Sequence, residues 1–516
     1  MKRIAALTLA AVLCFGGVGA AGAVDVKVAG EWDFAFGWSN NLGFKDSIHN
    51  NTKNQADDSI LARQRIRTQI DFVASENLSA TLMFEIGDIN WGRDENGKNG
   101  QGSGGALDAD GVNVETKRAY LDWMVPNTSV SVRMGIQGIA LPSTPMGSPL
   151  FDADVAGIVV SAPLTDWLAA SAVWLRPFDQ YDNDSSAGAG FDRSLDDEVD
   201  AFALLLPMKF EGLSFTPYGI YSFVGANSGI YDYVFAARGG FRNDNSVTAQ
   251  NSTTAYWLGA HMELSLFDPL VLNLEGIYGK LRPANLAGFA HPEAAPGLNE
   301  DWSLSRHLGT SGWFVAATLD YKMDNMTPGI FGWYGSGDSA NADHAGRSGR
   351  LPVLGNDGGS FGPTSFGTAG TFGIGTDGAV LGTGAGTWGV GIQLADVSFI
   401  EKLSHTLRFA YYRGTNDSDL IRKGYVKDNG VPIPGVANDS RYAADAMYLT
   451  DKDAVFEVNF DHTYEIYENL TAVLELGYLH LDVDKDVWKH QTMKPAGQRD
   501  GTDNAWKAEL NFQYKF

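Results

Sequence analysis

The sequence predicts an all-β protein: a transmembrane antiparallel β-barrel with 18 strands, short periplasmic turns and long extracellular loops, with 16 strands as the alternative count. The first observation is the end of the chain, 505–516, where apolar residues from Trp506 to Phe516 fill every even position and polar residues fill the odd ones. A period of two places these two sets on opposite faces of one β-strand. The second observation is length, because a tilted strand needs roughly 9–11 residues to cross a bilayer. The third is a regular order of strand, long polar segment, strand and short turn.

The N-terminus predicts export from the cytoplasm. Lys2 and Arg3 precede an apolar run over 4–15, and small residues then lead to an A-x-A site ending at Ala23. This is the pattern of a cleaved secretory signal peptide. We therefore expect residues 1–23 to be a signal peptide and 24–516 to form a single barrel domain. The only cysteine, Cys14, leaves with the signal, so the mature chain has no disulfide to stabilise it.

The strand count follows from the segments that separate the strands. An even number of strands puts both termini on the side of the short turns, and the first strand, 25–38, can then pair with the last. Such closure removes every exposed sheet edge. Aromatic residues gathered at strand ends fit the girdles found at membrane interfaces. The short turns lie near 75–78, 126–128, 163–167, 208–212, 268–269, 323–328, 396–404 and 463–469, and the longer segments near 39–58, 88–111, 138–150, 178–197, 224–252, 281–310, 337–386, 414–452 and 482–504.

The formal net charge is −24 at pH 7. An acidic chain is a poor partner for nucleic acid, which rewards basic surfaces. Much of the acidic excess falls in the predicted loops, where we expect it to bind divalent cations that bridge to lipopolysaccharide.

Three arginines form the sharpest local signal. Arg63, Arg65 and Arg67 stand at successive i, i+2 positions, so their guanidinium groups rise along one strand face in steps of roughly 7 Å. On the polar face of a barrel strand they would make a positive ladder on the lumen wall, because guanidinium presents a planar fork of donors suited to carboxylate, phosphate or sulfate. The alternative is that they pair with lumen carboxylates such as Asp71 and Glu85. The full set of expected pore-lining residues is Arg63, Arg65, Arg67, Glu85, Arg118, Arg133 and Arg176.

The segment 138–150 is unusual among the loops because it is apolar and stiffened by prolines. Such a loop has little reason to extend into water, and its place as the third loop is where trimeric porins carry a loop that narrows the pore. The alternative is a loop packed on a neighbouring subunit. Two aspartates after it could face the arginines and create a transverse field. The predicted constriction residues are Leu141, Pro142, Pro145, Met146, Pro149, Asp152 and Asp154.

Signatures of catalysis and metal binding are weak. The GxGxxG match at 384–389 has no strand–turn–helix around it, and the GxSxG match at 358–362 lies within a Gly-rich run. The aspartates at 482, 484 and 486, and at 108 and 110, could hold Ca²⁺ but form no complete binding loop. We expect no enzyme activity, no cofactor and no protein metal centre, with loop-bound Ca²⁺ as the one open alternative.

The chain resembles the outer membrane homotrimeric porins of sulfate-reducing bacteria. The resemblance rests on the signal peptide, Val26–Trp38, Arg63–Gly87, Thr116–Val132 and the terminal Phe516. It implies a homotrimer in the outer membrane of a Gram-negative bacterium and passive entry of small hydrophilic solutes, including small anions. Tyr514 and Phe516 resemble the signal that the barrel assembly machinery reads.

Three functions are compatible with these features. The first is a general diffusion porin, with a weak anion preference if the arginine ladder lines the narrow part of the bore. The second is a channel selective for small anions. The third is a structural or adhesive barrel that acts through its long loops, 337–386 and 414–452.

Overall fold

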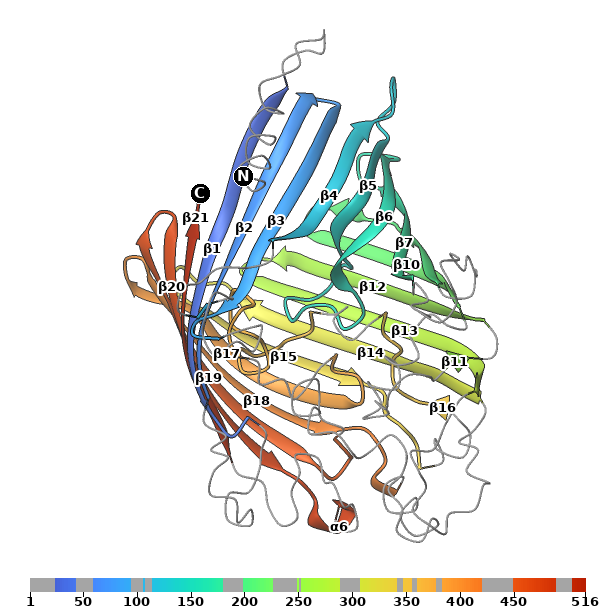
Figure 1. The fold of residues 1–516 in the computed structure, drawn as a ribbon. Helices are drawn as coiled ribbons and strands as arrows, with labels where there is room; N and C mark the ends of the chain where they lie inside the picture. The colour runs from blue at the N-terminus through green and yellow to red at the C-terminus, as the bar shows by residue number, and fades with distance from the viewer. Residues whose placement is uncertain are drawn as a thin grey trace.

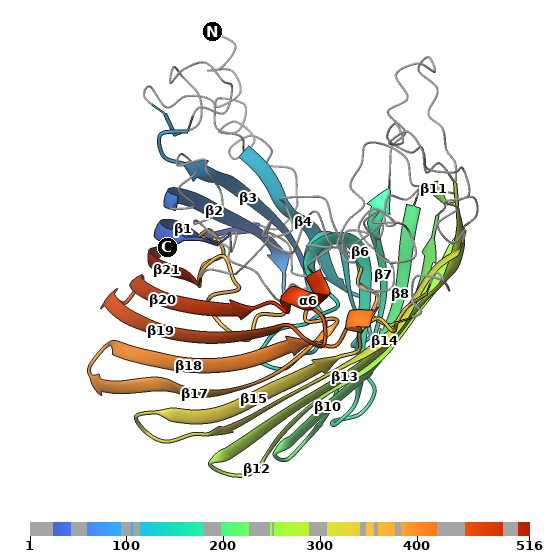
Figure 2. The ribbon, with the colours of Figure 1, turned by 90° about the horizontal axis from the view of Figure 1, so that it is seen from below.

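The computed structural model describes residues 24–42, 59–93, 105–106, 114–179, 198–225, 248–249, 252–287, 307–340, 347–354, 360–376, 383–419, 449–488 and 504–516. Within these ranges the chain forms one closed, antiparallel barrel of 18 strands (Figures 1 and 2). The predicted count of 18 is confirmed. The first nine positions around the barrel are β1 (Asp25–Asn40), β2 (Ser59–Ser75), β3 (Leu78–Asn90), β4 (Val114–Met124), β5 (Ser131–Ala140), β6 (Asp152–Pro163), β7 (Ala169–Asp179), β8 (Glu198–Leu205) continued by β9 (Met208–Phe210), and β10 (Leu213–Val224).

The second half of the barrel has longer strands. Two short pairing segments, β11 (Thr248–Ala249) and β16 (Arg347–Ser348), and the helix α6 (Lys485–Trp488) accompany it. The remaining nine strands are β12 (Thr253–Phe267), β13 (Leu270–Ala287), β14 (His307–Tyr321), β15 (Thr327–Gly335), β17 (Thr387–Ile400), β18 (Leu403–Gly414), β19 (Ala454–Tyr467), β20 (Leu470–Asp482) and β21 (Ala505–Lys515).

The first and last strands close the barrel. β1 pairs with β2 on one side and with β21 on the other, and the register aligns Trp32 with Tyr514 and Trp38 with Ala508. The pairing continues to the end of the chain, because the Phe516 N–H donates to the Gly30 carbonyl (3.0 Å) and the Gly30 N–H donates to the Phe516 carbonyl (2.9 Å). No edge strand is left at this seam.

Alternation along each strand separates the outside of the barrel from its lumen. On β1, Trp32 and Trp38 are exposed on the outer face, whereas Asp33 and Ser39 are buried on the lumen face. The same division repeats around the barrel, with large apolar side chains outward. An apolar exterior on a closed barrel is the arrangement that lets β-strands cross a bilayer, because every backbone group is paired and no edge meets lipid. Among the described helices, none is long and apolar enough to cross a membrane.

Most short turns lie where the sequence places them, but several are shorter than expected. The segment 396–404 was predicted as a turn, yet β17 runs to Ile400 and only Glu401 and Lys402 connect it to β18. Bulges between Leu394 and Ile400 disturb the alternation there, which made the strand end hard to see in the sequence. Similarly, β19 runs to Tyr467, and the predicted turn at 463–469 reduces to 468–469. The signal peptide, 1–23, and the aspartates at 108 and 110 lie outside the described residues.

Candidate functional site

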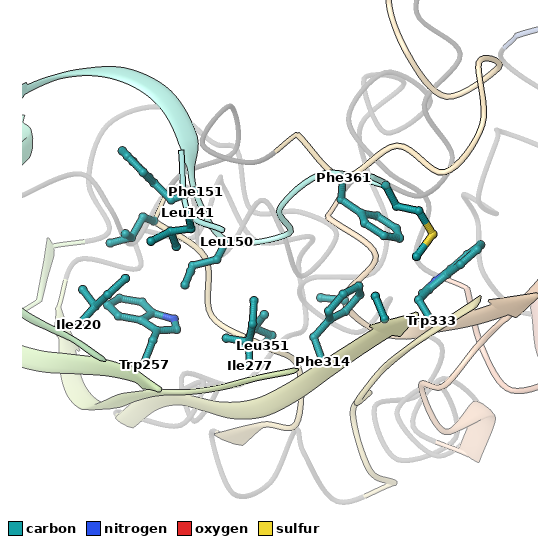
Figure 3. Close-up of a cluster of buried hydrophobic side chains, with 14 of the residues drawn as sticks. Leu141, Leu150, Phe151, Ile220, Trp257, Ile277, Phe314, Trp333, Leu351 and Phe361 are labelled. Atoms are coloured by element: carbon teal, nitrogen blue, oxygen red, sulfur yellow. The ribbon is translucent and has the colours of Figure 1, made fainter. Parts of the chain in front are cut away.

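Loop 3, the connection 141–151 between β5 and β6, folds into the bore. Leu141, Met146 and Leu150 are buried, and Leu150 is wholly inaccessible. These side chains join a cluster that includes Trp257 of β12, whose side chain points into the lumen (Figure 3). The prediction of an inward loop is therefore supported by its packing on its own barrel. Of the prolines, Pro149 is buried, Pro142 is half-buried and Pro145 is exposed.

The tip of loop 3 also has a polar attachment. The Thr144 N–H donates to the Glu275 carboxylate on β13 (3.4 Å), and both side chains are buried. The Glu275 carboxylate on the lumen face thus accepts a hydrogen bond from a buried loop amide that would otherwise have no partner.

A second loop enters the bore, which the sequence analysis did not predict. Loop 7 is the connection 336–386 between β15 and β17, and its described parts run inside the barrel (yellow to orange in Figure 1). Its first arm packs on a set of apolar lumen-facing side chains that we call the apolar wall. The Trp257 indole N–H donates to the Pro352 carbonyl (2.8 Å), and Phe361 makes edge contacts with Phe314 (5.2 Å) and Trp333 (5.5 Å; Figure 3). The apolar wall consists of Ile220, Trp257, Ile277, Phe314 and Trp333.

The second arm of loop 7, 365–376, lies against the other side of the lumen, which we call the charged wall. Here the loop is held through its backbone. The Thr371 N–H donates to Glu475 (2.7 Å), and the Lys507 ammonium donates to the Thr368 carbonyl (3.0 Å). The Thr376 N–H donates to the Glu509 carboxylate. The charged wall consists of Asp33, Arg65, Glu457, Asn459, Glu475, Lys507, Glu509 and Asn511, all buried on the lumen faces of β1, β2 and β19–β21.

The two loops are bonded to each other. The Ser360 N–H donates to the Ser148 carbonyl and the Gly362 N–H donates to the Met146 carbonyl, both at 2.8 Å. Gly147 makes this loop contact possible, because its φ of +84° suits glycine and a Cβ there would lie 2.1 Å from the Ser360 carbonyl oxygen. Loops 3 and 7 therefore form one inserted structure that spans the bore from the apolar wall to the charged wall.

The arginine ladder lies on the lumen face of β2, and its arginines are bound to carboxylates and to loop 7. Arg65 is 5% exposed, lies 3.5 Å from Asp33 and donates to the Gly373 and Phe372 carbonyls of loop 7. Arg63 donates to the Ile374 carbonyl (3.2 Å). These two arginines therefore hold loop 7 in place as well as contributing charge.

Arg67 belongs to a network of ion pairs along β2–β6. It lies 3.2 Å from Glu31 and 2.6 Å from Glu85, and Glu85 is also 3.6 Å from Lys117. The sequence offers Glu85 both as a lumen residue and as a partner of the ladder arginines, and in the structure it is a partner of Arg67.

Arg118 and Asp154 come together, and Lys117 connects them through Glu85 to Arg67 of the ladder. β4 and β5 pair only from Ala119↔Ile136 to Met124↔Ser131. Beyond that point Arg118 and Lys117 reach from β4 to Asp154 on β6, at 2.7 and 2.8 Å. Asp154 thus pairs with both cations, and Asp152 is exposed at the start of β6.

Arg133 lies on the lumen face of β5. It donates two hydrogen bonds to Asp122 (2.8 and 2.9 Å), and its guanidinium lies 4.3 Å from the centre of the Tyr120 ring. With 41% of its side chain exposed, it is the most accessible of the predicted lumen arginines. It lines a cavity of about 370 Å³ below loop 3.

The structure corrects the position of Arg176. On β7, Val173 and Leu175 face the lumen, so Trp174 and Arg176 face outward. Arg176 pairs there with Asp200 (2.8 Å) rather than lining the pore. The prediction assumed that a polar side chain marks the lumen face, but the lumen face of β7 is apolar because it borders the cavity and loop 3.

Phe516 and Tyr514 lie at the seam of the barrel. Their rings stack with 6.1 Å between centroids, and the Phe516 ring covers Gly30 of β1. No group of three or more potential metal ligands occurs in the described residues. Asp484 instead accepts hydrogen bonds from the N–H groups of Asp486 and Val487 at the start of α6.

Loop 7 had a signal in the sequence that was overlooked. The segment was grouped with the polar loops because of its many glycines, yet Leu351, Leu354, Phe361 and Phe366 interrupt it. Large apolar residues in a Gly-rich loop indicate burial. Phe366 is fully buried and lies over Gly477, where a Cβ would come within 2.6 Å of its ring.

The fold and the bore define the protein as a membrane-spanning β-barrel with inserted loops. No family model and no curated protein matches the sequence. Among solved structures, the barrel is similar to Acinetobacter baumannii OccAB1, with 12% identity over 95% of this chain and 97% of that chain and a TM-score of 0.49. It is also similar to Pseudomonas aeruginosa OccK2 (OpdF) in complex with glucuronate (11%, 95% and 98%, TM-score 0.46) and to Pseudomonas aeruginosa OpdK with vanillate (10%, 95% and 98%, TM-score 0.44).

Proposed function

We propose that the protein is a porin of a Gram-negative outer membrane that lets small hydrophilic solutes and ions diffuse passively through its bore. The observation that carries this proposal is a closed barrel whose lumen has a charged wall and whose bore is narrowed by loops 3 and 7. A barrel of 18 strands leaves room for an aqueous channel. Loops held inside it by hydrogen bonds set which solutes fit.

A weak anion preference is part of the proposal. Each arginine of the ladder has a carboxylate within 4 Å, with Asp88 3.6 Å from Arg63. Paired charges leave only a small net field along β2, so the preference is smaller than three free cations would create.

Single-channel conductance in a planar bilayer tests the porin function directly. We expect discrete, voltage-independent current steps in salt solution from the purified chain. A barrel that inserts without any current would refute the proposal and favour a structural role.

Reversal potential under a salt gradient tests the ion preference. We expect the Arg63→Gln/Arg65→Gln/Arg67→Gln variant to shift the reversal potential toward cations. The matched Arg63→Lys/Arg65→Lys/Arg67→Lys variant keeps the charge and should stay near wild type. An unchanged potential in the glutamine variant would remove the ladder from the selectivity of the channel.

The proposal includes assembly as a homotrimer through the barrel assembly machinery, with Tyr514 and Phe516 as its signal, and loops bridged to lipopolysaccharide by divalent cations. The closed seam supports the role of the terminal strand in barrel assembly, since Phe516 is bonded to β1 at both of its backbone groups. Deleting Phe516 should lower the yield of heat-modifiable trimer in outer membranes, and an unchanged yield would contradict it.

A second candidate function, a substrate-selective channel, is favoured by one observation. The cavity below loop 3 joins apolar and polar groups in a defined arrangement, which a purely aqueous pore does not need.

A further inference from the structure

The cavity below loop 3 is ordered in rows by strand register. Its floor, toward the short turns, is a row of serines: Ser131 faces Ser161 across β5 and β6, and Ser161 faces Ser171 across β6 and β7. The hydroxyls of Ser161 and Ser171 lie 2.8 Å apart. Three hydroxyl groups at one level offer both donors and acceptors to a molecule in the cavity.

The next row and the roof are apolar. Register places Val159, Val173 and Ala203 side by side on β6, β7 and β8, with Ile220 beyond them on β10. The roof is formed by side chains of loops 3 and 7, namely Leu141, Phe151 and Leu354, of which the first two are seen above Ile220 in Figure 3. Elsewhere the apolar wall is covered by loop side chains, but here the apolar surface borders an empty space of about 370 Å³.

The flank of the cavity is charged but balanced. Arg133 donates two parallel hydrogen bonds to Asp122 from Nε and Nη2, so the charge of the guanidinium is balanced by this carboxylate. An anion that bound the remaining N–H groups would lie close to the Asp122 carboxylate, and the repulsion between the two negative charges would offset much of its attraction to Arg133. The site therefore favours a neutral ligand over an anionic one.

We propose that this cavity binds small neutral molecules with an apolar body and a hydroxyl head, of the size and kind of benzyl alcohol. The body lies between the Val159–Val173–Ala203 row and the roof, and the hydroxyl reaches the serine row. The inference rests on the proposed function, because solutes reach the cavity only through the bore, and it names a substrate class beyond simple hydrophilic solutes.

The test measures current block in single channels of the full chain in a planar bilayer. Three probes are compared: benzyl alcohol, glycerol, which lacks the apolar body, and benzoate, which keeps the body but has an anionic head. We expect benzyl alcohol to block at a concentration at least about tenfold lower than either of the others, because it alone buries its ring without burying a charge.

Two matched variants locate the site. Ala203→Phe places a ring in the Val159–Val173–Ala203 row, where it fills the space for the ligand, and should raise the half-blocking concentration of benzyl alcohol about tenfold or more. Ala172→Phe adds the same ring to the outer face of β7, next to Leu204, and should block as wild type does. Ser161→Ala/Ser171→Ala should weaken the block by benzyl alcohol less than Ala203→Phe does.

Conductance without any probe separates the two proposals. A chain that carries no current refutes the porin function, whereas current that none of the probes blocks refutes the cavity as a binding site. Block by benzoate at the same concentration as benzyl alcohol would make it an anion site instead. Equal block of wild type and Ala203→Phe would place the effect of benzyl alcohol in the bilayer and overturn the inference.

Discussion

The two sides of the lumen hold the same loop by different means. On the apolar wall, loop 7 is attached by side chains, as where Phe361 packs between Phe314 and Trp333. On the charged wall it is attached by its backbone, through amides that donate to Glu475 and Glu509 and carbonyls that accept from Lys507 and Arg65.

This difference follows from what an irregular loop needs inside a barrel. A segment without regular structure has unpaired amides and carbonyls, and each must find a partner if it is removed from water. An apolar surface offers few partners, such as the Trp257 indole N–H, so a loop there makes most of its contacts through side chains that face the wall. A wall of carboxylates, a lysine and arginines can bind the backbone itself, so small residues such as Gly370, Gly373 and Gly375 suffice.

Loop 7 is the element that bridges the apolar wall and the charged wall, so removing it should have the largest effect on conductance. Replacing 360–376 with a short Gly-Ser linker should raise single-channel conductance at least about twofold, because the loop occupies cross-section that ions could use. Leu258→Ala, at an exposed position on the outer face of β12, serves as the control and should leave conductance unchanged. Unchanged conductance after the deletion would mean that the current path avoids loop 7.

The charged wall can be weakened at one buried ion pair. Arg65→Gln should lower the free energy of unfolding by about 3–5 kcal/mol, because it leaves the inaccessible Asp33 carboxylate without its cation and removes the donors to loop 7. Arg67→Gln, at a more exposed position with two carboxylates, should cost only about 1 kcal/mol. Guanidinium unfolding in lipid vesicles measures both. Equal losses of unfolding free energy in the two variants would show that the hydrogen bonds from Arg65 to the carbonyls of loop 7 add no stability.

The smallest expected effect concerns the contact between the two loops. Gly147→Ala should lower the free energy of unfolding by about 1–3 kcal/mol through backbone strain and the approach to the Ser360 carbonyl, and should increase current noise. Gly219→Ala, in β10, meets only ordinary contacts and should cause no loss. Equal current noise in the Gly147→Ala and Gly219→Ala variants would show that the contact between loops 3 and 7 does not control the noise, and would contradict this prediction.

Much of the fold could be predicted because one signal repeats in every strand. Alternation with a period of two specifies which side chains share a face, and a closed barrel follows when many long strands alternate and both termini lie on the turn side. The inward course of loop 3 was one of two expectations from the sequence, since the apolar residues Leu141, Met146 and Leu150 have little reason to extend into water, and the structure buries them inside the barrel.

Other features were decided by the tertiary structure. Whether Arg176 faced the lumen depended on which face of β7 met loop 3 and the cavity, and polarity alone pointed to the wrong side. The pairing of Arg65 with Asp33 depended on the register between β1 and β2, in which a shift of one residue would reverse every face. The sequence by itself determined the barrel and most of its lipid-facing surface, because these depend on local periodicity, and it favoured 18 strands over 16. The tertiary structure decided that loop 7 crosses the bore and is bound by Arg63 and Arg65, because these groups lie more than 300 residues apart in the chain. It also decided that the ladder is neutralised, because strand pairing brings the carboxylates of neighbouring segments to the arginines.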